Sequence, residues 1–222
     1  MTSATALIPA YNEEITIADV IRACKHCPYI EEVIVIDDGS VDHTSAISIA
    51  NGADVIRLEH NTGKAMALCT GAQKAKNPVV LLLDADLIGF QPIHAFYMVN
   101  PVLESSQIST LGVFSNGRIL TDLAHHITPQ LSGQRCMPKS ILTSLKNMTD
   151  VGYGIEILIH RKLKEQGYDI QKVKLDHVTH VTKEEKKILQ CHQKPNVEVK
   201  KRMEMYKDIF RELSSKKESS HG

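Results

Sequence analysis

Two acidic residues, Asp84 and Asp86, follow an apolar run, Val79–Leu83, that has the composition of a buried strand. A carboxylate that leaves water without a partner is strongly disfavoured. A divalent cation removes this penalty, because Mg²⁺ and Mn²⁺ take oxygen ligands from the protein together with phosphate oxygens of a substrate. The pair therefore indicates a metal site at a strand end, or else two solvated acids.

The first half of the chain alternates between short apolar strands and amphipathic helices. Strands are predicted over 4–8, 32–36, 54–58 and 79–83, and helices over 12–25, 44–50 and 64–76, with Asn12 as the first helix cap. Repeated β-α-β units predict a parallel sheet with right-handed crossovers, whose ligands bind at the carboxyl ends of the strands. The polar segments that follow these ends are 9–14, 37–42, 61–64 and 84–86. We therefore expect them to form one site.

Composition excludes several classes of protein. The 26 Lys and Arg residues balance the 26 Asp and Glu residues, and the chain has no Trp, so nothing favours nucleic acid as a partner. No apolar stretch approaches the roughly 18 residues of a transmembrane segment, and the N-terminus lacks the basic start of a signal peptide.

Five cysteines, an odd number, favour a reducing compartment, and we expect a cytoplasmic protein. Cys24 and Cys27 leave open a redox pair or half of a zinc site.

Three common nucleotide or phosphate motifs are also excluded. Gly63 and Lys64 do not form a Walker A loop, because Ala65 stands where Ser or Thr is required. The first strand is not followed by the glycine-rich turn of a dinucleotide-binding fold. A receiver domain would carry its acidic pair after the first strand, whereas Asp37 and Asp38 end the second.

Four motifs, in order and at ordinary spacing over roughly residues 6–95, resemble those of the family-2 glycosyltransferases of GT-A fold. They are Ile8-Pro9-Ala10-Tyr11-Asn12-Glu13-Glu14, Val35-Ile36-Asp37-Asp38-Gly39-Ser40, Asn61-x-Gly63-Lys64 and Asp84-Ala85-Asp86. The resemblance implies an α/β fold of Rossmann-like type, a mostly parallel sheet flanked by helices, with a C-terminal helical extension. Within it we expect a nucleotide-sugar-binding half over 1–110, an acceptor-binding half over 111–195, and an amphipathic helix and disordered tail over 196–222.

The resemblance also implies a metal-dependent glycosyltransferase with Mg²⁺ or Mn²⁺ as cofactor. It would move a sugar from a nucleotide sugar, UDP-linked as in UDP-glucose, to a phosphorylated small molecule, a polyprenyl phosphate or a cell-envelope glycan. Asp86 would be catalytic and the direct metal ligand, with Asp84 as a further member of the metal site. The implied donor-binding residues are Pro9, Ala10, Tyr11, Glu13, Asp38, Lys64, Asp84, Ala85 and Gly133.

Some of these residues also have a purely structural interpretation. Asp37 can cap the turn before Gly39, and Asp42 can cap the helix that follows it. Lys64 can be a solvated residue at a helix start, although a cation there opposes the helix dipole.

The second half is less regular, and its motifs concern the acceptor. Ser132-Gly133-Gln134-Arg135 resembles the family's segment that lines the sugar pocket. Gly152–Ile157 opens a predicted helix that runs to Gln166. The sequence of this segment resembles that of the glucosyl-3-phosphoglycerate synthases. Many family-2 enzymes have a Glu-Asp pair here, and its absence leaves an inverting or a retaining outcome open. Glu156 is the candidate catalytic base or hydroxyl-orienting group, or else a carboxylate that stabilises the helix start.

A histidine after the last predicted strand, 169–175, completes the metal site in the family. His180 fits this role better than His177, because it lies further beyond the strand; both can also be solvated loop residues. From Val197 on, apolar and basic residues at helical spacing predict a helix that packs on the domain, on a second subunit of a homodimer, or on an anionic membrane. A non-catalytic nucleotide-sugar-binding protein or accessory subunit is the alternative function.

Overall fold

The structure is a computed structural model that describes residues 3–114, 132–145 and 154–181. It has two compact units, 1–178 and 179–222, and the described part of the second is 179–181. The described strands are β1 (Ala4–Ala10), β2 (Ile30–Asp37), β3 (Asp54–Arg57), β4 (Val79–Leu82), β5 (Leu87–Ile88), β6 (Ile108–Phe114), β7 (Arg135–Pro138), β8 (Asp169–Leu175) and β9 (Thr179–His180). The described helices are α1 (Ile17–Lys25), α2 (Thr44–Ala50), α3 (Lys64–Lys74), α4 (Pro92–Glu104), α6 (Lys139–Thr143) and α7 (Ile155–Glu165).

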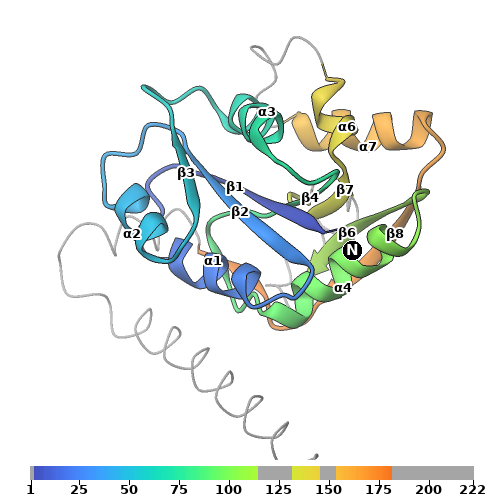
Figure 1. The fold of residues 1–222 in the computed structure, drawn as a ribbon, viewed down its shortest axis with the longest axis horizontal. Helices are drawn as coiled ribbons and strands as arrows, with labels where there is room; N and C mark the ends of the chain where they lie inside the picture. Colours follow the sequence, from blue (N-terminus) through green and yellow to red (C-terminus); the bar gives the residue numbers. More distant parts are fainter. Residues whose placement is uncertain (1–2, 115–131, 146–153, 182–222) are drawn as a thin grey trace, which may run out of the picture. The chain divides into compact units, whose positions relative to one another are not determined.

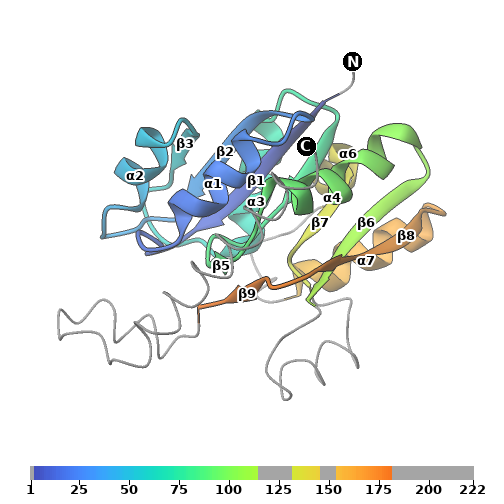
Figure 2. The same cartoon turned by 90° about the horizontal axis from the view of Figure 1, so that it is seen from below.

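The first unit is built on a seven-stranded sheet of order β3-β2-β1-β4-β7-β6-β8. It extends from β3 at one edge to β8 at the other (Figures 1 and 2). Strands β3, β2, β1 and β4 are parallel, β6 is parallel to β8, and β7 runs antiparallel to its neighbours β4 and β6. The predicted mostly parallel sheet is confirmed.

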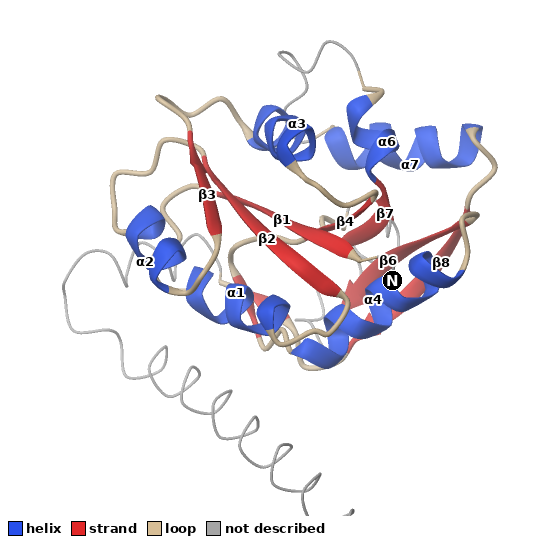
Figure 3. Ribbon diagram, in the orientation of Figure 1, coloured by secondary structure: helices blue, strands red, loops and turns tan. Residues whose placement is uncertain are grey.

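Helices cover both faces of this sheet, with α1, α2 and α4 on one side and α3, α6 and α7 on the other (Figures 1 and 3). In β4 and the residue after it, Val79, Leu81 and Leu83 belong to the core on the α1 and α4 side, whereas Val80 and Leu82 belong to the core on the α3 side. A strand buried on both faces needs apolar side chains at every position, because successive residues point to opposite faces. This accounts for the continuous apolar run before Asp84.

Several elements differ from the prediction or were not predicted. Helix α1 begins at Ile17 and not at Asn12. Strands β6 and β7 and helix α4 had no clear signal in the sequence. The expected division after residue 110 falls within β6 and stays a prediction, and the C-terminal helix expected from residue 196 lies outside the described residues. Within the ranges that the structure describes, no helix is both long and apolar enough to cross a membrane.

Candidate functional site

The loops after β1 and β2 are joined at the carboxyl edge of the sheet by Asn12. Its backbone N–H donates to Ser40 Oγ at 2.9 Å, and its Oδ1 accepts the backbone N–H of Val41 at 2.9 Å. Asn12 has a φ of 57°, in the left-handed region that Asn tolerates better than most residues. The expectation that Asn12 caps α1 is therefore wrong, because its side chain connects two loops.

Asp38 organises the loop that leads into α3. Its Oδ1 accepts hydrogen bonds from the backbone N–H of Thr62 at 2.7 Å and from the Thr62 hydroxyl at 2.9 Å, and its Oδ2 accepts from the Gly63 N–H at 2.8 Å. The residue is buried. Asp38 thus holds the segment before Lys64, and its contact with a nucleotide stays a prediction.

Asp37 and Asp42 have the structural roles that the sequence allowed for them, as caps of a turn and of a helix. Asp37 Oδ1 accepts the Ser40 N–H at 2.8 Å, which closes the turn after β2. Asp42 Oδ1 accepts the Thr44 N–H at 3.0 Å, at the start of α2.

The first predicted donor loop follows the end of β1. Pro9 and Ala10 end the strand, the Tyr11 side chain is 46% exposed, and the Glu13 N–H donates to Thr44 Oγ1 at 2.8 Å. An exposed aromatic ring beside an ordered loop can contact a ligand, but the roles of these four residues stay predictions.

Lys64, the first residue of α3, connects two carboxylates. Its Nζ lies 2.6 Å from Asp84 Oδ1 and 2.7 Å from Glu156 Oε1. Burial by itself would lower the pKa of Lys64, but the charges of Asp84 and Glu156 and their hydrogen bonds outweigh it and raise that pKa. Lys64 is therefore an ion-paired cation in this structure and not a freely solvated one.

Asp84 also contacts the segment that precedes β7. Gln134 Nε2 donates to Asp84 Oδ2 at 2.7 Å. A Cβ atom on Gly133 would lie 2.6 Å from both Asp84 Oδ2 and Lys64 Nζ, so that only glycine fits here without displacing them. Ala85 is buried. Gly133 thus has a steric role beside the acidic pair, and its predicted contact with the donor stays a prediction.

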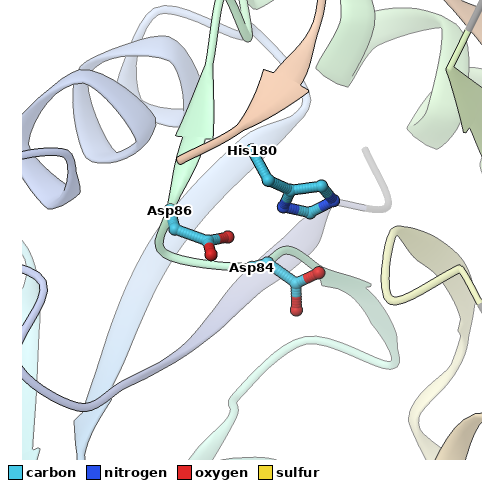
Figure 4. A group of neighbouring side chains, drawn as sticks. All are labelled: Asp84, Asp86 and His180. Atoms are coloured by element: carbon cyan, nitrogen blue, oxygen red, sulfur yellow. The ribbon is translucent and has the colours of Figure 1, made fainter. Parts of the chain in front are cut away.

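Asp84, Asp86 and His180 each offer one ligand atom, and these atoms all lie within 4.8 Å of one another (Figure 4). Ligand atoms about 2.0–2.6 Å from one ion are at most about 5 Å apart, so this set fits a single divalent cation. Two carboxylates and one imidazole are ligands that suit Mn²⁺ and, less well, Mg²⁺. It is the only such group among the described residues, and His177 is not part of it.

Glu156 lies in the first turn of α7 and is buried, with a second cation nearby. This is Arg135, which is fully buried and whose Nε donates to the Ser132 carbonyl at 3.2 Å. Burial lowers the pKa of Arg135 to about 10, and the charge of Glu156 opposes this shift. Arg135 therefore remains protonated at neutral pH, and Glu156 lies near two cations, Lys64 and Arg135.

Gln134 was expected only as part of the segment that resembles the sugar-pocket lining, with no role of its own. Its hydrogen bond to Asp84 joins residues 50 apart in the chain, and no local sequence pattern indicates such a contact.

Cys24 and Cys27 are free thiols, and burial raises the pKa of each. Because the thiolate is the reactive and metal-binding form, this environment disfavours both the redox and the zinc interpretation of the pair.

A mostly parallel α/β sheet with an acidic pair after an inner strand is the arrangement that the four motifs predicted. The family model described as glycosyl transferase family 2 matches residues 5–129, more than half of the chain. The chain therefore belongs to glycosyl transferase family 2.

Individual relatives include the glucosyl-3-phosphoglycerate synthase of Mycobacterium tuberculosis, which is 29% identical over 190 residues, with 69% of this chain and 58% of the relative covered. An undecaprenyl-phosphate 4-deoxy-4-formamido-L-arabinose transferase of Pseudomonas fluorescens is 34% identical over 91 residues, with 36% of this chain and 27% of the relative covered. The chain thus spans 58% of the length of the first of these relatives.

Solved structures agree with this assignment. The glucosyl-3-phosphoglycerate synthase of Mycobacterium tuberculosis in complex with Mn²⁺ and UDP-glucose has a TM-score of 0.70 and 28% identity, with 82% of this chain and 72% of that chain covered. The same enzyme in complex with Mg²⁺ and UDP has a TM-score of 0.68 and 28% identity, with 82% of this chain and 72% of that chain covered. The expected GT-A fold is confirmed by these neighbours.

Proposed function

We propose that this chain is a metal-dependent glycosyltransferase that moves a sugar from a UDP-linked donor, such as UDP-glucose, to a phosphorylated small molecule. The observation that carries the proposal is the group of Asp84, Asp86 and His180, whose ligand atoms fit one divalent cation. Lys64, within hydrogen-bonding distance of Asp84, adds a positive charge where a diphosphate would lie. The related synthase that is complexed with Mn²⁺ and UDP-glucose supports the choice of metal and donor.

On this proposal, Asp84, Asp86 and His180 hold Mg²⁺ or Mn²⁺, with Asp86 as the main carboxylate ligand. The bound ion would stabilise the negative charge that develops on the departing diphosphate. Lys64 would attract the same phosphates. Pro9, Ala10, Tyr11, Glu13 and Asp38 follow the ends of β1 and β2 and would contact or order the nucleotide, with Ala85 and Gly133 packed beside the diphosphate.

Glu156 is the residue we assign to the acceptor side. Because Lys64 lies 2.7 Å from its Oε1 and Arg135 is close by, Glu156 is held in place as a hydrogen-bond acceptor. This environment supports orientation of the acceptor hydroxyl by Glu156. A phosphorylated small-molecule acceptor is favoured over a polyprenyl phosphate because the matches to the synthase cover 69% of the chain, and those to the prenyl-phosphate enzyme 36%.

A cytoplasmic location stays a prediction, supported by the free thiols of Cys24 and Cys27.

The test is transfer from UDP-glucose with Mn²⁺, with 3-phosphoglycerate, undecaprenyl phosphate or no acceptor in parallel reactions, and with product mass as the readout. We expect a hexose adduct of 3-phosphoglycerate that disappears with EDTA and with Asp86→Ala. An adduct of undecaprenyl phosphate alone would reassign the acceptor.

Binding of UDP-glucose and Mn²⁺ without hydrolysis or transfer to any acceptor would favour the accessory, non-catalytic protein instead. Absence of both Mn²⁺ binding and UDP-sugar binding would reject the proposed function. Calorimetry on the same preparation separates these two outcomes.

A further inference from the structure

The buried side chain of Gln134 is placed at the acidic pair by the sheet topology. Strand β7 runs antiparallel to β4, with Arg135 opposite Leu82. The residues just before Arg135 therefore lie beside those just after Leu82. This register brings Gln134 to Asp84 at the carboxyl edge of β4.

The orientation of the Gln134 amide is determined by its contact with Asp84. Its Nε2 lies 2.7 Å from Asp84 Oδ2, and because an ionised carboxylate only accepts hydrogen bonds, the amide nitrogen must face it. Its Oε1 lies 2.9 Å from the Ser132 hydroxyl, which is also buried. Gln134 is fully buried, so its own amide is shielded from water.

Asp84 has a different kind of partner on each oxygen. Lys64 donates to Oδ1 at 2.6 Å and Gln134 donates to Oδ2 at 2.7 Å. Lys64 is a flexible cation with a 30% exposed side chain, and a bound diphosphate would attract it away from Asp84. Gln134 is neutral and enclosed, so its hydrogen bond persists when Lys64 moves.

We propose that Gln134 is a positioning residue for the metal site, whose amide orients the Asp84 carboxylate without adding charge beside the cation. This inference rests on the proposed function. A basic residue at this position would repel a divalent ion, and a carboxylate would repel Asp84, whereas an amide does neither. Hydrogen bonds from buried neighbours to metal-site carboxylates commonly determine metal affinity.

The test measures the affinity for Mn²⁺ alone, from the electron paramagnetic resonance signal of the free ion, for the wild-type chain and for Gln134→Met. Methionine keeps the length of the side chain and removes its donor. We expect about tenfold weaker Mn²⁺ binding, at the lower end of the effects of such supporting groups. Gln171→Met, at an exposed position of β8, is the matched control and should bind Mn²⁺ like the wild type.

An unchanged Mn²⁺ affinity in a folded Gln134→Met chain would overturn the proposal, whereas failure of the wild-type chain to bind Mn²⁺ would instead reject the proposed function. If Gln134→Met does not fold, Gln134→Asn is measured, because its amide is one methylene too short to reach Asp84 and the same loss is expected.

A second comparison tests whether the effect passes through Asp84. In an Asp84→Asn background, Gln134→Met should cause no further loss of Mn²⁺ affinity. A further loss of the same size there would show that Gln134 acts by another route and would overturn the proposed mechanism.

Discussion

Lys64 and Glu156 lie 92 residues apart in the chain, and their side chains are joined by a hydrogen bond of 2.7 Å between Nζ and Oε1. The same ammonium contacts Asp84 at 2.6 Å. One cation therefore bridges the acidic pair at the end of β4 and the carboxylate at the start of α7. If the proposed function is right, this bridge connects the donor side of the site to the acceptor side, and binding of a diphosphate by Lys64 would release Glu156.

Replacement of this cation should destabilise the chain. Lys64→Met leaves Asp84 and Glu156 close together without the charge between them, and removal of one partner of a buried pair is strongly destabilising. Because the Lys64 side chain is 30% exposed, we expect the free energy of unfolding to fall by only about 1–3 kcal/mol, below the range for fully buried pairs. Urea unfolding without metal measures it. Lys74→Met, at the exposed end of the same helix, is the control, and equal stabilities of the two variants would contradict the prediction.

Glu156→Gln tests the acceptor-side role. Glutamine keeps the size of the side chain and can still accept the hydrogen bond from Lys64, but it has no negative charge and is not a base. We expect kcat for glycosyl transfer to fall by about 10²-fold or more, with donor affinity nearly unchanged. Steady-state kinetics and calorimetry with UDP-glucose and Mn²⁺ measure the two quantities. Glu165→Gln, on the exposed end of α7, should behave like the wild type, and a normal rate in Glu156→Gln would remove the assigned role.

The half of the fold that positions Asp84 was predictable from the sequence for a physical reason. Strands β1, β2 and β4 are covered on both faces, so each ends in a continuous apolar run that contrasts with the polar loop after it: residues 6–10, 33–36 and 79–83. Because parallel strands end at the same edge, the order of motifs was enough to predict one site.

Strands β6 and β7 lack this signal because their buried polar groups bond to distant partners. The Ser109 hydroxyl donates to the Cys136 carbonyl at 3.0 Å, and the Thr110 hydroxyl donates to the Met98 carbonyl at 2.7 Å. Arg135 is fully buried within β7. Such residues are typical of loops or of the surface when only the sequence is considered, since their acceptors are supplied by the tertiary structure. The contact of Gln134 with Asp84 was not predicted for the same reason.

Gly133→Ala should weaken the site by a steric effect. The added methyl group would lie 2.6 Å from Asp84 Oδ2 and from Lys64 Nζ, so that both side chains must move. We expect Mn²⁺ affinity to fall about tenfold, with a loss of unfolding free energy of about 1–3 kcal/mol from overpacking. Gly167→Ala is a useful control, because it introduces backbone strain at a φ of 78° in open space. It should lower stability and leave Mn²⁺ binding unchanged, and a Gly133→Ala chain that binds Mn²⁺ normally would contradict the steric argument.

Glu32 should make the free energy of unfolding depend on pH. It lies near the start of β2, away from the site at the carboxyl ends of the strands. Burial disfavours its charged form, but hydrogen bonds from the Lys76 N–H at 2.9 Å and the Thr5 hydroxyl at 2.7 Å, with the Lys76 ammonium, outweigh burial and lower the pKa of Glu32. Since the folded pKa lies below the unfolded one, folding favours the ionised form. The stabilisation is therefore present at neutral pH and is lost as the pH falls below about 4.5 through the folded pKa.

Glu32→Gln should accordingly be less stable than the wild type at pH 7, and the difference should shrink as the pH falls from 5 to 3. Urea unfolding across this range measures it. Glu31→Gln is the matched control, because the neighbouring side chain is exposed and should show no such pH-dependent difference. A gap between wild type and Glu32→Gln that is the same at both ends of the range would contradict the prediction. Mn²⁺ affinity should be unchanged in Glu32→Gln, because Glu32 lies near the start of β2 and the acidic pair follows the end of β4.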